Sequence, residues 1–116
     1  MLILKLLSDA DFIVSYEVHD YRQWDRGFYY NIRIVFIDSS MLIAREYIDE
    51  PQRDYSFHWQ NSDNKLLKRW DNAPHYRELM TFPYHMHMES WVIESMVVSL
   101  EDVLTQIEGI LKDKKS

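Results

Sequence analysis

The pattern of apolar and polar positions predicts a succession of short β-strands over most of the chain. Apolar side chains recur at every second position, with polar side chains between them. A period of two is typical of strands that bury one face. We expect about six strands joined by short polar turns. They cover residues 11–21, 28–37, 41–48, 53–60, 65–70 and 84–89.

A different period begins at Ser99 and predicts a C-terminal amphipathic helix. Ser99 with Asp102 three residues later forms a variant of the capping box, a signal that starts helices. The apolar residues that follow fall on one helical stripe: Leu100, Val103, Leu104, Ile107, Ile110 and Leu111. The predicted fold class is α+β: a twisted antiparallel meander of about six strands with the C-terminal helix packed on one face.

Length and composition restrict the class of protein. The 116 residues suit one domain, which we expect to span residues 1–116. The absence of cysteine excludes a disulfide framework, a thiolate zinc site and a cysteine nucleophile. The apolar start is shorter than the ~20 residues of a bilayer span, so we expect no membrane association and a cytoplasmic location. The net charge of −6 argues against broad nucleic-acid binding, but is compatible with a small basic site acting on RNA.

Residues 68–89 concentrate the side chains with catalytic potential. They include three of the five histidines and an Arg-Trp-Asp run. Strand parity places His85 and His87 opposite the neighbouring methionines, and His58 opposite the aromatic residues of 53–60. If the aromatic and methionine faces are buried together, these imidazoles share one face of the sheet. The candidate site consists of His58, Arg69, Asp71, His75, His85 and His87.

This combination of side chains is compatible with three functions. Imidazoles titrate near neutral pH and transfer protons, and Arg69 would stabilise a phosphorane-like transition state. Together these roles describe metal-independent RNA cleavage. His75, His85 and His87 could instead bind zinc or another divalent metal, and no other cofactor is expected. The same surface could also bind a partner protein without catalysis.

Structural roles are the alternative for the same residues. A His-x-His pair on a solvent-facing strand is more often two exposed histidines than a metal site. Asp71 or Asn72 could accept hydrogen bonds from backbone amides in a turn. The aromatic stripes at 28–36 and 55–59 are expected in the core, not as a base-stacking platform.

Three blocks of the chain resemble the TumE family of toxin–antitoxin proteins. They read YSFHWQ at 55–60, KLLKRWDNAPH at 65–75 and TFPYHMH at 81–87. The helix from Ser99 resembles the closing helix of that family, and the resemblance covers most of the chain from about residue 30 to residue 108. It implies a small cytoplasmic toxin encoded beside a helix-turn-helix antitoxin, which would be its partner.

The chain departs from the family pattern at two positions. In the family, the asparagine–proline turn is often followed by paired histidines, and the later motif often reads Phe-Pro-His-His-x-His. Tyr76 and Tyr84 occupy two of these histidine positions. His75, His85 and His87 match histidine positions of the family. A mechanism that needs the two missing imidazoles is not implied for this chain.

The leading interpretation is the toxin component of a type II toxin–antitoxin system that acts as a small endoribonuclease, an activity common among small toxins. Arg69 and the histidines would carry the chemistry, and Asp71 would orient them. The alternatives are a non-catalytic protein-binding module and a metal-dependent hydrolase that uses the same histidines. RNA is the substrate under the leading interpretation, and a homodimer is left open.

Overall fold

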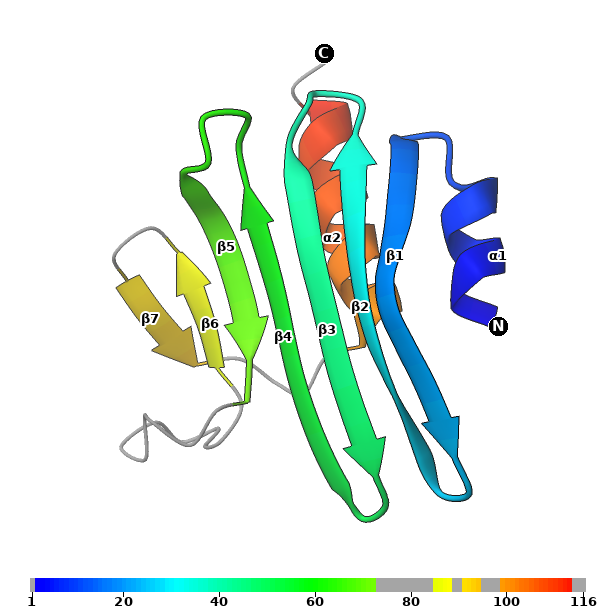
Figure 1. Cartoon of the computed structure of the whole chain (residues 1–116). Coiled ribbons are helices and arrows are strands. Elements are labelled where there is room, and N and C mark those ends of the chain that lie inside the picture. The colour runs from blue at the N-terminus through cyan, green and yellow to red at the C-terminus, as the bar shows by residue number, and fades with distance from the viewer. Residues whose placement is uncertain (1, 73–84, 89–90, 95–98, 114–116) are drawn as a thin grey trace.

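The computed structural model describes residues 2–72, 85–88, 91–94 and 99–113; residues 2, 85–88 and 91–94 are described by their backbone. Within them, a seven-stranded antiparallel sheet is accompanied by two helices (Figure 1). The elements are α1 (Leu2–Asp9), β1 (Ile13–Trp24), β2 (Gly27–Phe36), β3 (Met41–Asp49), β4 (Gln52–Gln60), β5 (Leu66–Asp71), β6 (His85–Met88), β7 (Trp91–Glu94) and α2 (Leu100–Asp113). The predicted α+β meander is confirmed, and β7 adds one strand to those expected.

The two faces of the sheet have different surroundings. Each strand pairs with its neighbour in sequence, so the sheet order is β1-β2-β3-β4-β5-β6-β7. Figure 1 shows α2 lying against one face, behind β2 and β3, and α1 beside β1 at the sheet edge. Neither described helix is long and apolar enough to cross a membrane. We call the face covered by α2 the buried face and the opposite one the open face.

The buried face and α2 form one hydrophobic core. The strands contribute side chains that are at most 4 % exposed: Tyr30, Ile32, Ile34, Phe36, Leu42, Ala44, Tyr55, Phe57, Trp59 and Trp70. The helix contributes Leu100, Val103, Leu104, Ile107 and Leu111. Full burial of one large apolar side chain is worth about 1.5–3 kcal/mol, so this contact holds α2 in place. The predicted aromatic face and helical stripe are confirmed for the described side chains.

The first hairpin is longer than the sequence pattern indicated. A polar turn was expected between the strands at 11–21 and 28–37, but β1 continues to Trp24, and a two-residue turn leads to Gly27, its cross-strand partner. Glycine is required there because a Cβ atom would lie 1.7 Å from the backbone oxygen of Ile48. The extension of β1 brings Arg22 next to the aromatic side chains of the open face.

Two irregularities change the side-chain alternation of β1. Its register with β2 shifts at Val14 and again after Val18. An extra residue at a β-bulge reverses the face on which the following side chains lie. The alternation over residues 11–21 predicts one inward face for Phe12, Val14, Tyr16 and Val18. This is wrong for Val14, which lies at the first bulge and is 64 % exposed. Val18 pairs with Ile32 of the buried face, although it is itself 39 % exposed.

Candidate functional site

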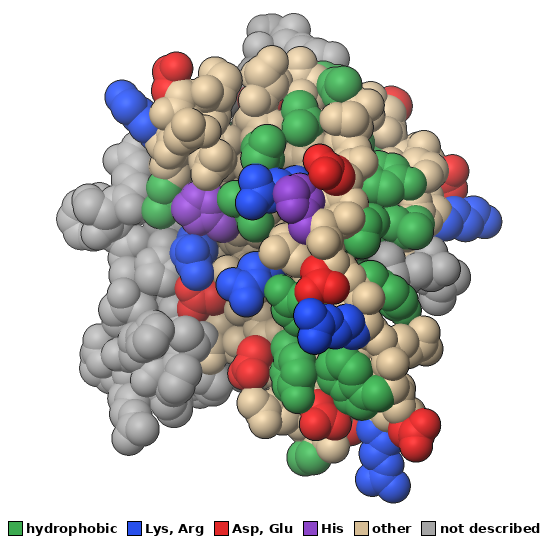
Figure 2. Space-filling model, in the orientation of Figure 1, with side chains coloured by type: hydrophobic (Ala, Val, Ile, Leu, Met, Phe, Trp, Pro, Cys, Tyr) green, Lys and Arg blue, Asp and Glu red, His purple; other side chains and the backbone are tan. Residues whose placement is uncertain are grey.

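Polar side chains on the open face follow cross-strand rows. Paired positions of neighbouring antiparallel strands present their side chains on one face, about 4.5–5.5 Å apart. The His58 row consists of Glu17, Arg33, Ile43, His58 and Arg69. The Arg45 row consists of Asp20, Asn31, Arg45, Ser56 and Asp71, and the Tyr47 row of Arg22, Tyr29, Tyr47 and Asp54. Figure 2 shows acidic, basic and histidine side chains gathered on this face.

His58, Arg69 and Asp71 form a connected cluster across β4 and β5. Nε of Arg69 donates a 2.9 Å hydrogen bond to Oδ2 of Asp71, whose side chain is only 6 % exposed. Nη1 of Arg69 lies 3.4 Å from Nδ1 of His58, and Nε2 of His58 lies 3.1 Å from Oε1 of Gln60. A guanidinium group can only donate, so Nδ1 accepts and Nε2 carries the proton. The cluster therefore assigns one tautomer to His58.

The surroundings of His58 favour its neutral form. Burial is the main cause that lowers the pKa of His58, and the positive charge of Arg69 lowers it further. The hydrogen bond with Gln60 acts in the opposite direction without reversing the shift. Because the ordinary pKa is already near 6.5, His58 is neutral at pH 7. A neutral imidazole next to a guanidinium group combines a proton acceptor with a site for an anion.

The remaining predicted site residues lie beyond the described side chains. The backbone of β6 pairs His87 with Arg69 and His85 with Asp71, next to the cluster. The side chains of His85 and His87, and the whole of His75, lie outside the described residues. Among the side chains that are described, no group of three His, Cys, Asp or Glu residues could hold a metal ion. The three histidines predicted as metal ligands are not among them.

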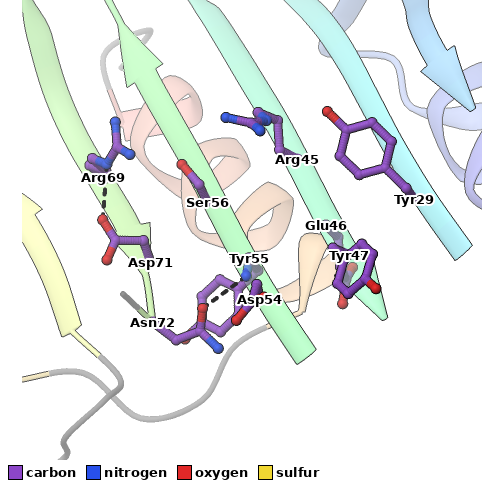
Figure 3. A pocket seen from close by; sticks show the side chains of 10 residues that line it. All are labelled: Tyr29, Arg45, Glu46, Tyr47, Asp54, Tyr55, Ser56, Arg69, Asp71 and Asn72. Carbon is purple, nitrogen blue, oxygen red and sulfur yellow. Dashed lines mark hydrogen bonds and ion pairs between the residues drawn. The ribbon is translucent and has the colours of Figure 1, made fainter. Parts of the chain in front are cut away.

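A pocket of about 380 Å³ lies beside the cluster (Figure 3). It is lined by Tyr29, Arg45, Glu46, Tyr47, Asp54, Tyr55, Ser56, Arg69, Asp71 and Asn72. Arg45 is exposed and has no hydrogen bond or ion pair within the described part of the chain. Arg45 was not among the site residues predicted from the sequence, although it has the same strand parity as Tyr47. Arg45 and Arg69 make their part of the pocket suitable for a negatively charged group, whereas Glu46, Asp54 and Asp71 contribute carboxylates to the same lining.

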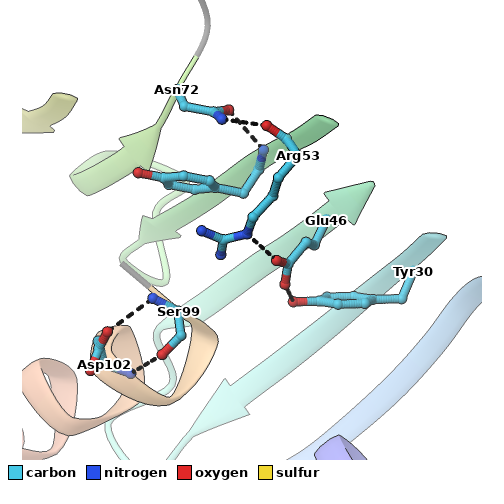
Figure 4. Close-up of polar contacts among 7 residues, drawn as sticks. Tyr30, Glu46, Arg53, Asn72, Ser99 and Asp102 are labelled. Carbon is cyan, nitrogen blue, oxygen red and sulfur yellow. Dashed lines mark hydrogen bonds and ion pairs between the residues drawn. The ribbon is translucent and has the colours of Figure 1, made fainter. Parts of the chain in front are cut away.

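A buried polar network that the sequence analysis missed lies at one end of this pocket. Glu46 is 7 % exposed and accepts hydrogen bonds from the Tyr30 hydroxyl, at 2.9 Å, and from Nε of Arg53 (Figure 4). Burial, followed by the charge of Glu46, raises the pKa of Tyr30. The burial of Glu46 could have been predicted from the sequence, because Glu46 has the same strand parity as the buried residues Leu42 and Ala44.

Asn72 has the structural role that was considered for the turn after β5. Its Oδ1 accepts a 2.8 Å hydrogen bond from the backbone N–H of Tyr55, and its Nδ2 donates one of 2.6 Å to the backbone oxygen of Arg53 (Figure 4). Asn72 thus ties the end of β5 to β4. Asp71, its neighbour, bonds instead to Arg69 on the open face.

These observations define a small single-sheet α+β domain that carries a histidine–arginine cluster and an anion-suited pocket on its open face. The chain belongs to the toxin TumE family, whose family model matches residues 3–113, essentially the whole chain. Comparisons with curated proteins and with solved structures return no match. The family supports a toxin role for this chain, and a toxin of a toxin–antitoxin system implies an antitoxin as partner.

Proposed function

We propose that this chain is the toxin of a type II toxin–antitoxin system and acts as a metal-independent endoribonuclease, with a helix-turn-helix protein as its antitoxin. The observation that supports this activity is the contact between His58 and Arg69, with Arg69 bonded to the buried carboxylate of Asp71. An imidazole that is unprotonated at neutral pH and a cation beside it are the groups that RNA transesterification needs.

The proposed reaction is attack of a ribose 2′-oxygen on the adjacent phosphorus. The 2′-hydroxyl proton passes to Nδ1 of His58 as the new P–O2′ bond forms. Before this transfer Nη1 of Arg69 exchanges its hydrogen bond with Nδ1 for one with the phosphate, while Nε stays bonded to Asp71. The Nδ1 lone pair is then available for the proton, and the guanidinium group stabilises the charge of the phosphorane. The P–O5′ bond then breaks, and the departing 5′-oxygen takes a proton from a second histidine, which enters the reaction as an imidazolium and leaves it neutral. The products are a 2′,3′-cyclic phosphate and a 5′-hydroxyl.

His87 and His85 are the proposed donors of that second proton. Their backbones pair with Arg69 and Asp71, so they belong to the strand next to the cluster. His75 follows β5 in sequence and is the third candidate. Asp71 is a positioning residue in this proposal, because its contact is with Arg69 and a charge-assisted hydrogen bond fixes the guanidinium plane.

The test is cleavage of a labelled single-stranded RNA by the purified chain in the presence of EDTA. We expect cleavage with a 2′,3′-cyclic phosphate end, and a loss of roughly 10²–10⁴-fold in rate for His58→Ala, as for removal of a catalytic imidazole. His19→Ala, on β1 and outside the His58 row, is the matched control and should cleave as the wild type does. Equal rates for His58→Ala and wild type would contradict the proposal. Cleavage that chelator abolishes would point instead to a metal site built from His75, His85 and His87.

The second candidate is toxicity through protein binding without catalysis. The terminal strand β1 favours it, because Val14 and Val18 are 64 % and 39 % exposed there. Under this alternative, Val14→Asp abolishes growth arrest in cells that express the chain, while His58→Ala leaves it unchanged. The endoribonuclease proposal expects His58→Ala to abolish the arrest and the neighbouring antitoxin to reverse it.

A further inference from the structure

One end of the open face carries aromatic side chains that the core does not use. Tyr29 and Tyr47 are direct cross-strand partners, and both line the pocket beside Arg69. The ring of Trp24 lies 5.5 Å from that of Tyr47, tilted by 42°. Tyr47 and Trp24 both donate hydrogen bonds to the carboxylate of Asp49, each of 3.3 Å. These contacts orient the rings of Tyr47 and Trp24, which lowers the ordering cost of stacking a ligand on them.

Charges on the open face are distributed unevenly around these rings. Arg45 lies one row away from Tyr47, and Arg69 lies in the row beyond it. Successive rows are about 7 Å apart along the strands. The carboxylates of Asp49 and Asp54 lie at the aromatic end, and Arg22 in that row is ion-paired with Asp20. A ligand with a planar apolar part and a phosphate would therefore place the phosphate towards the arginines and the planar part on the tyrosines.

We propose that the open face binds single-stranded RNA, with an unpaired base stacked on Tyr29 and Tyr47 and the adjoining phosphates at Arg45 and Arg69. This inference rests on the proposed function and names the form of its substrate. In Figure 3 the ring of Tyr29 and the side chains of Arg45 and Arg69 lie on the same side of the sheet, around one pocket. The pocket thus joins the stacking surface to the catalytic cluster.

Single-stranded RNA fits these observations better than a duplex. The faces of bases are accessible for stacking only when they are unpaired, and aromatic side chains on a sheet are a general means of holding them. A net charge of −6 opposes long contacts with a polyanion, so binding must depend on a few arginines and on stacking. Two phosphate contacts predict a modest slope of about −1.4 for log K against log salt.

Binding of a non-cleavable RNA tests the inference separately from catalysis. The probe is a fluorescein-labelled, fully 2′-O-methylated oligonucleotide of mixed sequence, used single-stranded and annealed to its complement, with anisotropy as the readout. We expect the single strand to bind more tightly than the duplex. Tyr29→Ala and Tyr47→Ala should each weaken binding by roughly 5- to 150-fold, the range that base stacking gives. Tyr29→Phe keeps the ring and should bind as the wild type does, and Tyr47→Phe, which loses only the hydrogen bond to Asp49, should bind more tightly than Tyr47→Ala.

A matched control lies on the other face of the same sheet. Tyr21 is 41 % exposed, but it pairs with the buried Tyr30 and so points away from the open face. Tyr21→Ala should therefore leave binding unchanged, and thermal melting should show that all variants are folded. Wild-type binding by both tyrosine-to-alanine variants, or equal affinity for the duplex, would overturn the inference. The inference would also be overturned if Tyr29→Ala and Tyr47→Ala lost binding to the antitoxin while they bound RNA normally.

The outcomes for catalysis are distinct from these. His58→Ala should lose cleavage of unmodified RNA by a far larger factor than it loses affinity for the methylated probe. Stacking-dependent binding without any cleavage by the wild type would contradict the proposed activity and leave the single-strand site standing. Normal cleavage by Tyr29→Ala and Tyr47→Ala would contradict the single-strand site and leave the proposed activity standing.

Discussion

The two faces of β4 show how one strand serves two purposes. Tyr55, Phe57 and Trp59 point into the core under α2 and are at most 4 % exposed. Ser56 and His58, which alternate with them, lie on the open face in the two rows that lead to β5. The side chains of successive residues thus lie on opposite faces of the sheet. The buried face determines whether the domain folds, and the open face can vary in chemistry at little cost in stability.

The largest effect should come from breaking the buried face at its centre. Phe57 is fully buried and pairs with Ala44 and Trp70 on the adjoining strands. Phe57→Ala removes an aromatic ring and leaves a cavity, so we expect a loss of about 3–5 kcal/mol in the free energy of unfolding. Urea denaturation measures the change. Ser56→Ala, one residue away on the open face, should stay within about 0.5 kcal/mol, and equal losses at the two positions would refute the division between the faces.

Glu46 is a charged residue on the otherwise apolar buried face, and it tests whether a buried polar network stabilises that face. Its carboxylate accepts the hydrogen bond of the Tyr30 hydroxyl, which is buried with it. Glu46→Leu leaves that hydroxyl without its acceptor, and we expect a loss of about 1–3 kcal/mol in urea denaturation. Glu46→Gln keeps an acceptor oxygen for Tyr30 and should lose less. A gain in stability for Glu46→Leu would mean that the apolar character of the face outweighs the network.

The buried face was largely predictable from the sequence, and particular residues explain why. Phe57 and Ile34 follow the period of two, and Leu104 follows the helical stripe, because burial imposes these spacings. The capping box was also local: the N–H of Ser99 donates to Asp102 Oδ2 at 3.0 Å, and the N–H of Asp102 donates to Ser99 Oγ at 3.1 Å (Figure 4).

Prediction failed where the outcome depends on register. The first bulge of β1 changes the face of Val14, and no local sequence pattern predicts an extra residue in a strand. The contact of His58 with Arg69 needs the pairing of β4 with β5, which parity within one strand cannot supply. The hydrogen bond between Glu46 and Tyr30 likewise depends on the pairing of β2 with β3. Candidate residues could therefore be chosen from the sequence, but their partners could not.

The cap of α2 tests how firmly the helix covers the buried face. Ser99→Ala removes the acceptor for the Asp102 amide, and loss of such a cap costs about 0.5–2 kcal/mol. We expect a lower midpoint in urea without a change in the slope of the transition. Ser99→Asp, which keeps a capping oxygen, should retain most of the stability. If Ser99→Ala also abolished RNA cleavage in the folded state, the open face would depend on the helix more closely than we infer.

The smallest effect concerns the one titrating group that we place at the centre of the open face. The pKa of His58 is lower in the folded chain than its ordinary value of about 6.5, chiefly because of burial and then because of Arg69. The unfolded chain therefore binds more protons between the two pKa values, and stability rises with pH across that interval. The contribution is fully present above pH 6.5 and is lost as the pH falls through 6.5 towards the folded-state pKa. Urea denaturation of the wild type and His58→Gln between pH 5 and 8 should show a difference that changes only in this interval, because every other titrating group is common to both. A stability difference that grew with falling pH in favour of the wild type would mean that His58 is stabilised in its charged form, and would remove the neutral base from the proposed reaction.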